Sequence, residues 1–263
     1  MLNETILRLK FCLLIVIVII AIGIVCSLEP IPQAKEYHAF ADSQEHFGVA
    51  NANDVISNAA FIIAGVIGLI RIRQWVPSKE AKLWRFFFFS VILVGFGSAY
   101  YHLQPANTTL VWDRLPMTMG FAALTACVLD ERIGGEIGRK LFLPLVFSGL
   151  FSVIYWWATE LAGAGDLRFY ILTQYLPMLL IPAVLLLFPR SWRHSKFYWL
   201  LLGCYSMAKF FELHDALVFQ LTQQMLSGHT LKHLAAAAGI LLFRPVAPAA
   251  PDSNRDGNTI LLD

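Results

Sequence analysis

The sequence predicts an all-α polytopic membrane protein: a transmembrane helix bundle with a seven-helix core and one additional N-terminal transmembrane helix. Hydrophobic residues make up 57% of the 263 residues and charged residues only 14%, whereas soluble domains contain about 25% charged residues. The apolar residues are grouped into long runs, several of them near the ~20 residues that a helix needs to cross a bilayer. Lipid is therefore the expected solvent, and the net charge of +2 gives no support for a nucleic-acid partner.

Eight apolar runs define the predicted spans. The first, Phe11–Leu28, follows two basic residues, and a cleaved signal peptide is the alternative interpretation. Because the run is long for such a peptide and lacks a cleavage site of the A-x-A type, we interpret residues 1–28 as a retained membrane anchor. The other spans are predicted at 55–72, 86–103, 116–130, 141–159, 169–188, 197–219 and 228–243.

The charges of the loops predict the orientation of these spans. Residues 29–246 form the predicted seven-helix domain, and residues 247–263 form a flexible polar tail. Short cytoplasmic loops are rich in Lys and Arg. When the N-terminus is placed inside, 15 of the 20 basic residues fall on the cytoplasmic side. We therefore expect a multi-pass protein with both termini in the cytoplasm.

Ionisable residues inside or at the ends of spans are candidates for function, because their burial in lipid is costly. His102 ends the third predicted span, Asp113 lies in the short loop before the fourth, and His229 and His233 open the eighth. The loop charges place all four residues near the same, non-cytoplasmic face. The sequence thus predicts one site at that face.

The histidines have the spacing of a metal site. His229 and His233 are one helical turn apart, so both imidazoles project from one face of a helix. Such a pair can chelate one ion, and His102 can supply the third protein ligand of a catalytic zinc. The alternative is that histidines at a membrane interface bond to headgroups and water. The third histidine and Asp113 at the same depth favour the metal.

Two further side chains suit hydrolysis at such a metal. Asp113 can accept a proton from the activated water and return it to the leaving group, or it can orient a ligand histidine. Pairing with Arg114, or capping of a helix that begins near Pro116, is the alternative. Ser98 lies one turn before His102 and can donate to the reacting oxygen, although a serine beside glycines also serves close helix packing.

These residues together resemble the alkaline ceramidase family of seven-span membrane hydrolases, which is related to the adiponectin-receptor-like proteins. The similarity is carried, in the family's order, by Gly97-Ser98-Ala-Tyr-Tyr-His102, Asp113-Arg-Leu-Pro116-Met117 and Gly228-His229-Thr-Leu-Lys-His233. It implies that the three histidines hold zinc and that the serine and the aspartate complete the catalytic site. The implied reaction is hydrolysis of the N-acyl bond of a ceramide-like lipid to a sphingoid base and a fatty acid.

The family also carries a calcium site before its first core helix, followed by a Ser-Asn pair that Ser57-Asn58 matches here. A solvated loop in which Asp54 caps a helix is the alternative. The stretch is shorter than in the family, and an amide stands where an acidic ligand is expected. The oxygen-bearing candidates are of the type that calcium prefers, and they are Asp42, Glu45, Asn51 and Asp54.

Two other groups of residues have structural interpretations. Lys209 and Glu212 are predicted to form an intramembrane ion pair, with Asp215 one turn farther and facing the same interior. Aromatic residues around Trp156, Trp157 and Tyr170 are predicted to belong to an interfacial belt and not to a substrate pocket.

The sequence therefore favours a zinc-dependent amidase that acts on a membrane lipid. The main alternative is a receptor or signalling protein of the adiponectin-receptor type, in which a similar zinc site is structural or weakly hydrolytic. A metal transporter is disfavoured, because the ligands cluster at one end of the bundle and do not follow a path across it. The additional N-terminal span is expected to serve membrane insertion or contact with another protein.

Overall fold

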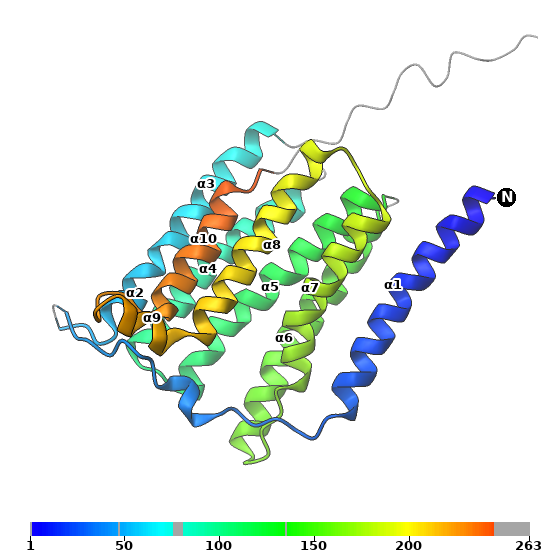
Figure 1. The fold of residues 1–263 in the computed structure, drawn as a ribbon. Coiled ribbons are helices and arrows are strands. Elements are labelled where there is room, and N and C mark those ends of the chain that lie inside the picture. Colours follow the sequence, from blue (N-terminus) through cyan, green and yellow to red (C-terminus); the bar gives the residue numbers. More distant parts are fainter. Residues whose placement is uncertain (1, 47, 76–80, 135, 245–263) are drawn as a thin grey trace, which may run out of the picture.

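The computed structural model describes residues 2–46, 48–75, 81–134 and 136–244. Over these ranges the chain is helical, which confirms the predicted all-α bundle (Figure 1). The predicted tail 247–263 lies outside the described residues. The elements in chain order are α1 (Leu2–Ser27), the 3₁₀ helix η1 (Lys35–His38), α2 (Ala52–Ser57), α3 (Ala59–Trp75), α4 (Ala81–Leu103), α5 (Asn107–Arg132), α6 (Ile137–Leu161), α7 (Arg168–Leu187), α8 (Trp192–Leu213), α9 (Asp215–Leu221) and α10 (Gly228–Leu242).

Helices occupy all eight predicted spans, but two of the predicted boundaries are wrong. The fourth span was predicted to begin at residue 116, whereas α5 begins at Asn107, so that Asp113 lies within the helix and not in a loop. The predicted seventh span, 197–219, is divided at His214 into α8 and α9. Hydropathy detects the apolar part of a helix, so polar turns at the end of a membrane-spanning helix are not included in the predicted span.

Five helices in the described ranges are long and apolar enough to cross a membrane, at Glu4–Ser27, Ala52–Arg73, Ala81–Leu103, Ile137–Leu161 and Arg168–Leu187. The other helices at predicted spans are α5, α8 and α10. Charged residues lower the hydropathy of α5 and α8, and α10 has only 15 residues. These same three helices carry Asp113, Lys209, Glu212, His229 and His233.

The helices pack so that the last one lies beside the first helices of the core. α4 packs against α3 and α5, whereas α10 packs against α8, α3 and α2. One apolar cluster surrounds Trp84, whose ring lies 4.9 Å from that of Phe243. A second cluster surrounds Tyr101 near the opposite end of α4. The site residues lie at this second end, where α4 ends and α10 begins.

The N-terminal helix α1 lies at the edge of the bundle, against α7, and the chain that follows it crosses the end of the bundle toward α2 (Figure 1). This crossing segment is fastened to the start of α7. The Leu167 N–H donates to the Ile31 carbonyl at 2.8 Å, and Arg168 donates to the Leu28 carbonyl at 2.6 Å. Hydrogen bonds from Arg168 also lower the pKa of the Asp166 carboxyl, which keeps this local ion pair charged.

The backbones of α4 and α5 come into contact at Gly97. A Cβ atom on Gly97 would overlap the Trp112 carbonyl oxygen and lie 3.4 Å from the Asp113 Cα. The same carbonyl lacks its usual helical donor, because that position is Pro116, which has no N–H. Small residues permit such close helix approach, and here the approach brings Ser98 next to Asp113.

Replacing Gly97 with Ala should separate α4 from α5 and destabilise the protein by about 1–3 kcal/mol, the usual cost of overpacking. The midpoint of thermal unfolding in detergent is the measurement. Gly203→Ala is the matched control, because a Cβ at Gly203 meets nothing within 4 Å. An unfolding midpoint for Gly97→Ala equal to that of the control would contradict the close approach.

Candidate metal centre and active site

Three buried histidines meet at the end of the bundle. His102 lies in the last turn of α4, and His229 and His233 lie in the first two turns of α10. Their exposed fractions are 1%, 5% and 2%. One ring nitrogen of each lies within 4.8 Å of those of the other two, so the three residues can hold a metal ion together. Burial of three imidazoles side by side is costly without such a shared partner.

The ring of His233 is oriented by Ser57, a residue whose role the sequence left unassigned. Ser57 Oγ donates to the Asp54 carbonyl at 2.9 Å and lies 2.8 Å from His233 Nδ1. Because the hydroxyl proton is used toward Asp54, the serine oxygen accepts from a protonated Nδ1. The neutral tautomer then carries its lone pair on Nε2, which is the arrangement of a metal ligand held by an outer partner.

His102 is positioned through its backbone and keeps one unsatisfied ring nitrogen. Asn51 Nδ2 donates to the His102 carbonyl at 2.9 Å, from a left-handed backbone conformation that asparagine tolerates. His102 Nδ1 is buried and has no hydrogen-bond partner among the described residues. A buried polar atom of this kind normally has a partner, and a bound ion would satisfy the cluster to which it belongs.

The third histidine has a cation beside it. Lys232 Nζ lies 3.0 Å from His229 Nε2 and 3.1 Å from Glu212 Oε1. A metal ion at the histidines would be repelled by this ammonium group. The Glu212 carboxylate reduces that repulsion, because it pairs with Lys232 and with Lys209. The predicted Lys209–Glu212 ion pair is thereby confirmed as part of a three-residue network.

Buried polar contacts hold the first turn of α10, and therefore its histidines, in place. Ser227 caps the helix by accepting from the Thr230 N–H at 2.9 Å. Both hydroxyls then donate to Asp54 Oδ1, at 3.1 and 2.6 Å. Asp215 accepts from the His229 N–H at 2.8 Å. Asp215 thus faces the start of α10, the helix that Glu212 also contacts through Lys232.

The four calcium candidates have protein partners or lie in solvent. Asp42 accepts from Gln44 and Asn53, Asn51 donates to the His102 carbonyl, and Asp54 accepts from α10, whereas Glu45 is exposed. Within the described ranges, the histidines form the group of His, Cys, Asp and Glu side chains suited to a metal ion. Calcium binding stays a prediction.

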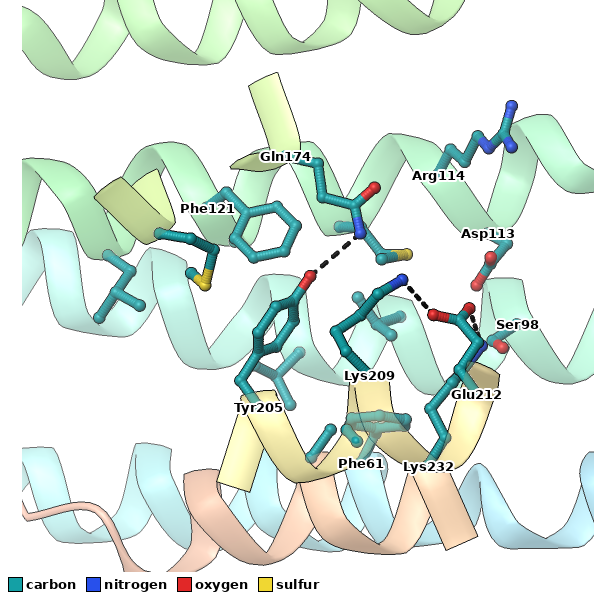
Figure 2. Close-up of a pocket in the computed structure, with 18 of the residues that line it drawn as sticks. Phe61, Ser98, Asp113, Arg114, Phe121, Gln174, Tyr205, Lys209, Glu212 and Lys232 are labelled. Carbon is teal, nitrogen blue, oxygen red and sulfur yellow. Dashed lines mark hydrogen bonds and ion pairs between the residues drawn. The ribbon is translucent and has the colours of Figure 1, made fainter. Parts of the chain in front are cut away.

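The predicted catalytic residues line a cavity next to the histidines. Ser98 and Asp113 both lie on the wall of a cavity of about 290 Å³, together with Lys232 and His233. Figure 2 shows Ser98, Asp113 and Glu212 at the same end of this cavity. The rest of its wall is mostly apolar. The structure thus brings together the residues that the sequence placed at one face.

The aromatic residues near Asp113 form a cage and not an interfacial belt. Trp156 is fully buried and Tyr170 nearly so, so the predicted belt is wrong for both. The Arg114 guanidinium carbon lies 4.2 Å from the Trp156 ring and 4.5 Å from the Tyr170 ring. A buried arginine explains the inward rotation of these rings, since cations are attracted to aromatic faces. The sequence signal was an arginine directly after Asp113, inside an apolar region.

The segment between α1 and α2 covers the histidines. The ring of Phe40 lies 4.6 Å from those of His102 and His229. The neighbouring Ala41 N–H donates to Asp215 at 3.0 Å. The same aspartate accepts from the His229 N–H, so one carboxylate fastens both the covering segment and the helix that carries His229 and His233. Hydrophobic patterning carried no signal for this contact, because the segment is short and irregular.

Comparison with protein families matches residues 46–243 to the ceramidase family. No curated protein matches the chain. The matched region includes the histidines, Ser98 and Asp113, whereas α1 and the segment that carries Phe40 precede it. Because the match covers most of the chain, it confirms the resemblance stated from the sequence. The chain therefore belongs to the ceramidase family of amide-bond hydrolases.

Proposed function

We propose that this protein is a zinc-dependent intramembrane amidase, which hydrolyses the N-acyl bond of ceramide-like lipids to a sphingoid base and a fatty acid. The observation that carries the proposal is the placement of three buried imidazoles beside a half-buried carboxylate and a buried hydroxyl, at one end of an apolar cavity. The donors suit zinc, since nitrogen ligands from three histidines leave a fourth position open for water.

The cavity suits the hydrocarbon part of a lipid. Its wall contains Phe87, Val91, Leu124 and Ile240, and Ser98, Asp113 and Glu212 lie together at one end of it, whereas Gln174 and Tyr205 lie farther along the wall (Figure 2). An acyl chain in the apolar part would leave the amide carbonyl near the polar end. With the basic loops in the cytoplasm, this end faces the non-cytoplasmic side, at the depth of the lipid headgroups.

The residues divide the chemistry as follows. Zinc, when bound, would polarise the substrate carbonyl and lower the pKa of water toward about 7. Asp113 accepts the proton of the attacking water and later donates it to the amine nitrogen as the carbon–nitrogen bond breaks. Once Asp113 is protonated, it no longer requires the hydroxyl hydrogen of Ser98. Ser98 can then turn that hydrogen toward the carbonyl oxygen as negative charge develops there.

Replacing His229 or His233 with Ala should reduce both bound zinc and turnover, because two ligands are too few for a stable site of this type. Elemental analysis of the purified protein, together with mass spectrometry of the lipid products, is the measurement. His46→Ala, at an exposed position, is the control. Unchanged zinc content in both variants would exclude ligation. The same elemental analysis reports calcium and so tests the acidic and amide candidates.

Replacing Ser57 with Ala should lower zinc affinity about 10- to 100-fold, the usual effect of losing a partner that orients a metal ligand. The measurement is zinc retention during titration with a chelator. Ser152→Ala is the matched control, because Ser152 is also buried and also donates to a backbone carbonyl, that of Gly149. Equal retention in the two variants would remove Ser57 from the metal centre.

Replacing Asp113 with Asn should lower the turnover number about 10²- to 10⁴-fold, the usual contribution of a proton-transfer group, while zinc content stays close to that of the unmodified protein. Asp130→Asn on the same helix is the control, since Asp130 pairs with Arg139 near the other end of α5. A turnover number equal to that of the unmodified protein would exclude Asp113 from proton transfer. Loss of turnover together with zinc would assign it to the metal centre instead.

A further inference from the structure

Arg114 is a buried cation with an unused hydrogen-bond donor. Its exposed fraction is 4%, and one nitrogen, Nη2, donates to the neutral Gln33 side chain at 2.6 Å. The other terminal nitrogen, Nη1, is buried and has no hydrogen-bond partner among the described residues. Arginine remains charged in proteins and offers five N–H donors. A buried arginine with this much unused donor capacity is therefore prepared for a ligand.

The surroundings of Arg114 hold the guanidinium without neutralising it. Rings of Trp156, Tyr170 and Tyr37 lie 4.2, 4.5 and 5.6 Å from its central carbon. They stabilise a cation but accept no strong hydrogen bond in its plane. The Glu160 carboxylate accepts from the Gln33 N–H and from Trp156 Nε1.

The guanidinium borders the cavity of the proposed active site. Arg114 lines this cavity together with Tyr37, Leu167 and Tyr170, so the cavity extends to the cage around the charged group. Asp113 precedes Arg114 in the chain and lines the same cavity, although the two side chains leave α5 in different directions, with Asp113 pointing toward Ser98 and Glu212 (Figure 2). A molecule whose amide bond lies at Asp113 thus has Arg114 close to its polar part.

The acidic and basic side chains that line the cavity do not balance. Asp113 and Glu212 are acidic, whereas Arg114, Lys209 and Lys232 are basic. Glu212 pairs with both lysines. When all five are ionised, one positive charge remains in excess. An uncompensated charge is costly in a low-dielectric interior, and a bound anion would remove that cost.

We propose that Arg114 binds an anionic oxygen group, a carboxylate or a phosphate, on the amide lipid that this protein cleaves. This inference rests on the proposed amidase function and narrows its substrate class to ceramide-like lipids with an acidic polar part. The unused Nη1, together with the remaining hydrogen of Nη2, offers two parallel donors to such a group. Gln33 holds the guanidinium in position, and the aromatic cage excludes water from the contact. Basic pockets between membrane helices bind lipid headgroups by the same chemistry.

Turnover of substrates with matched acyl chains tests the proposal in the full-length protein. The substrates are neutral ceramide, ceramide 1-phosphate and an N-acyl amino acid, and the last two distinguish phosphate from carboxylate. At least one anionic substrate should exceed neutral ceramide in kcat/KM by about 10- to 100-fold, the value of hydrogen bonds to a charged group. Arg114→Gln should abolish this preference mainly through a higher KM for the anionic substrate, so that kcat/KM for anionic and neutral substrates becomes similar. Equal use of all three substrates by the unmodified protein would overturn the proposal.

Three variants separate anion binding from a structural role of Arg114. Lys35→Gln removes an exposed positive charge from η1 and should keep the preference. Gln33→Met breaks the contact with Arg114 but retains the guanidinium, so it should keep most of the preference. If Gln33→Met and Arg114→Gln instead reduce turnover of every substrate equally, Arg114 only fastens the N-terminal segment. Should Arg114→Gln fail to fold, Arg114→Lys replaces it in the experiment. This variant keeps the positive charge and should retain part of the preference for the anionic substrate. An Arg114→Lys protein that still binds the anionic substrate but shows no preference for it would contradict the proposal.

A binding measurement separates failure of this inference from failure of the amidase proposal. Dodecyl phosphate, laurate and dodecanol are titrated against the protein in neutral lipid nanodiscs. Binding of an anionic amphiphile in preference to dodecanol, lost in Arg114→Gln, would support the anion site even if no lipid is cleaved. Cleavage of neutral ceramide without anion binding that depends on Arg114 would support the amidase and refute the anion site.

Discussion

The structure depends on the requirement that every polar group buried at the start of α10 has a partner. The first two turns of this helix carry two of the three histidines, and lipid offers no hydrogen bonds to them. Asp54 accepts hydrogen bonds from the Ser227 and Thr230 hydroxyls, and Ser57 Oγ accepts one from His233 Nδ1. α2 and the start of α10 therefore determine each other's position. The direction in which the imidazoles point follows from these contacts and not from apolar packing.

The same requirement explains why much of the site lies on the least apolar helices. α5 and α8 fall short of the hydropathy of a membrane span and α10 of its length, and they pack among helices that reach both. Charged groups such as Glu212 and Lys232 then contact one another inside the bundle instead of lipid. The additional N-terminal helix contributes to this arrangement, because the chain that follows it places Phe40 over the histidines and Gln33 against Arg114. An anchor for insertion alone would not require these contacts.

The parts that could be predicted follow from local rules of hydropathy and helical spacing. His229 and His233 share a face because they are one turn apart, and Lys209 pairs with Glu212 for the same reason. The wrong predictions concern polar helical turns and contacts between distant residues, on which hydropathy gives no information. The first turns of α5 are polar, so its start was placed too late, and Trp156 was assigned to a belt because its buried partner, Arg114, is distant from it in sequence. The contacts of Ser57 with His233 and of Phe40 with His102 and His229 could not be predicted from the sequence, because these partners are distant in the chain.

By itself the sequence determined the all-helical membrane fold, the family and the three histidines as one candidate cluster, since each is carried by composition, motif or spacing along one helix. Only the tertiary structure decided which nitrogen of His233 is available to a metal, which carboxylate fastens α10, and that a buried guanidinium borders the cavity. These features depend on side chains from different helices that approach within hydrogen-bond distance. Such distances follow from packing constraints like the contact at Gly97, which is a property of two helices together and of neither one alone.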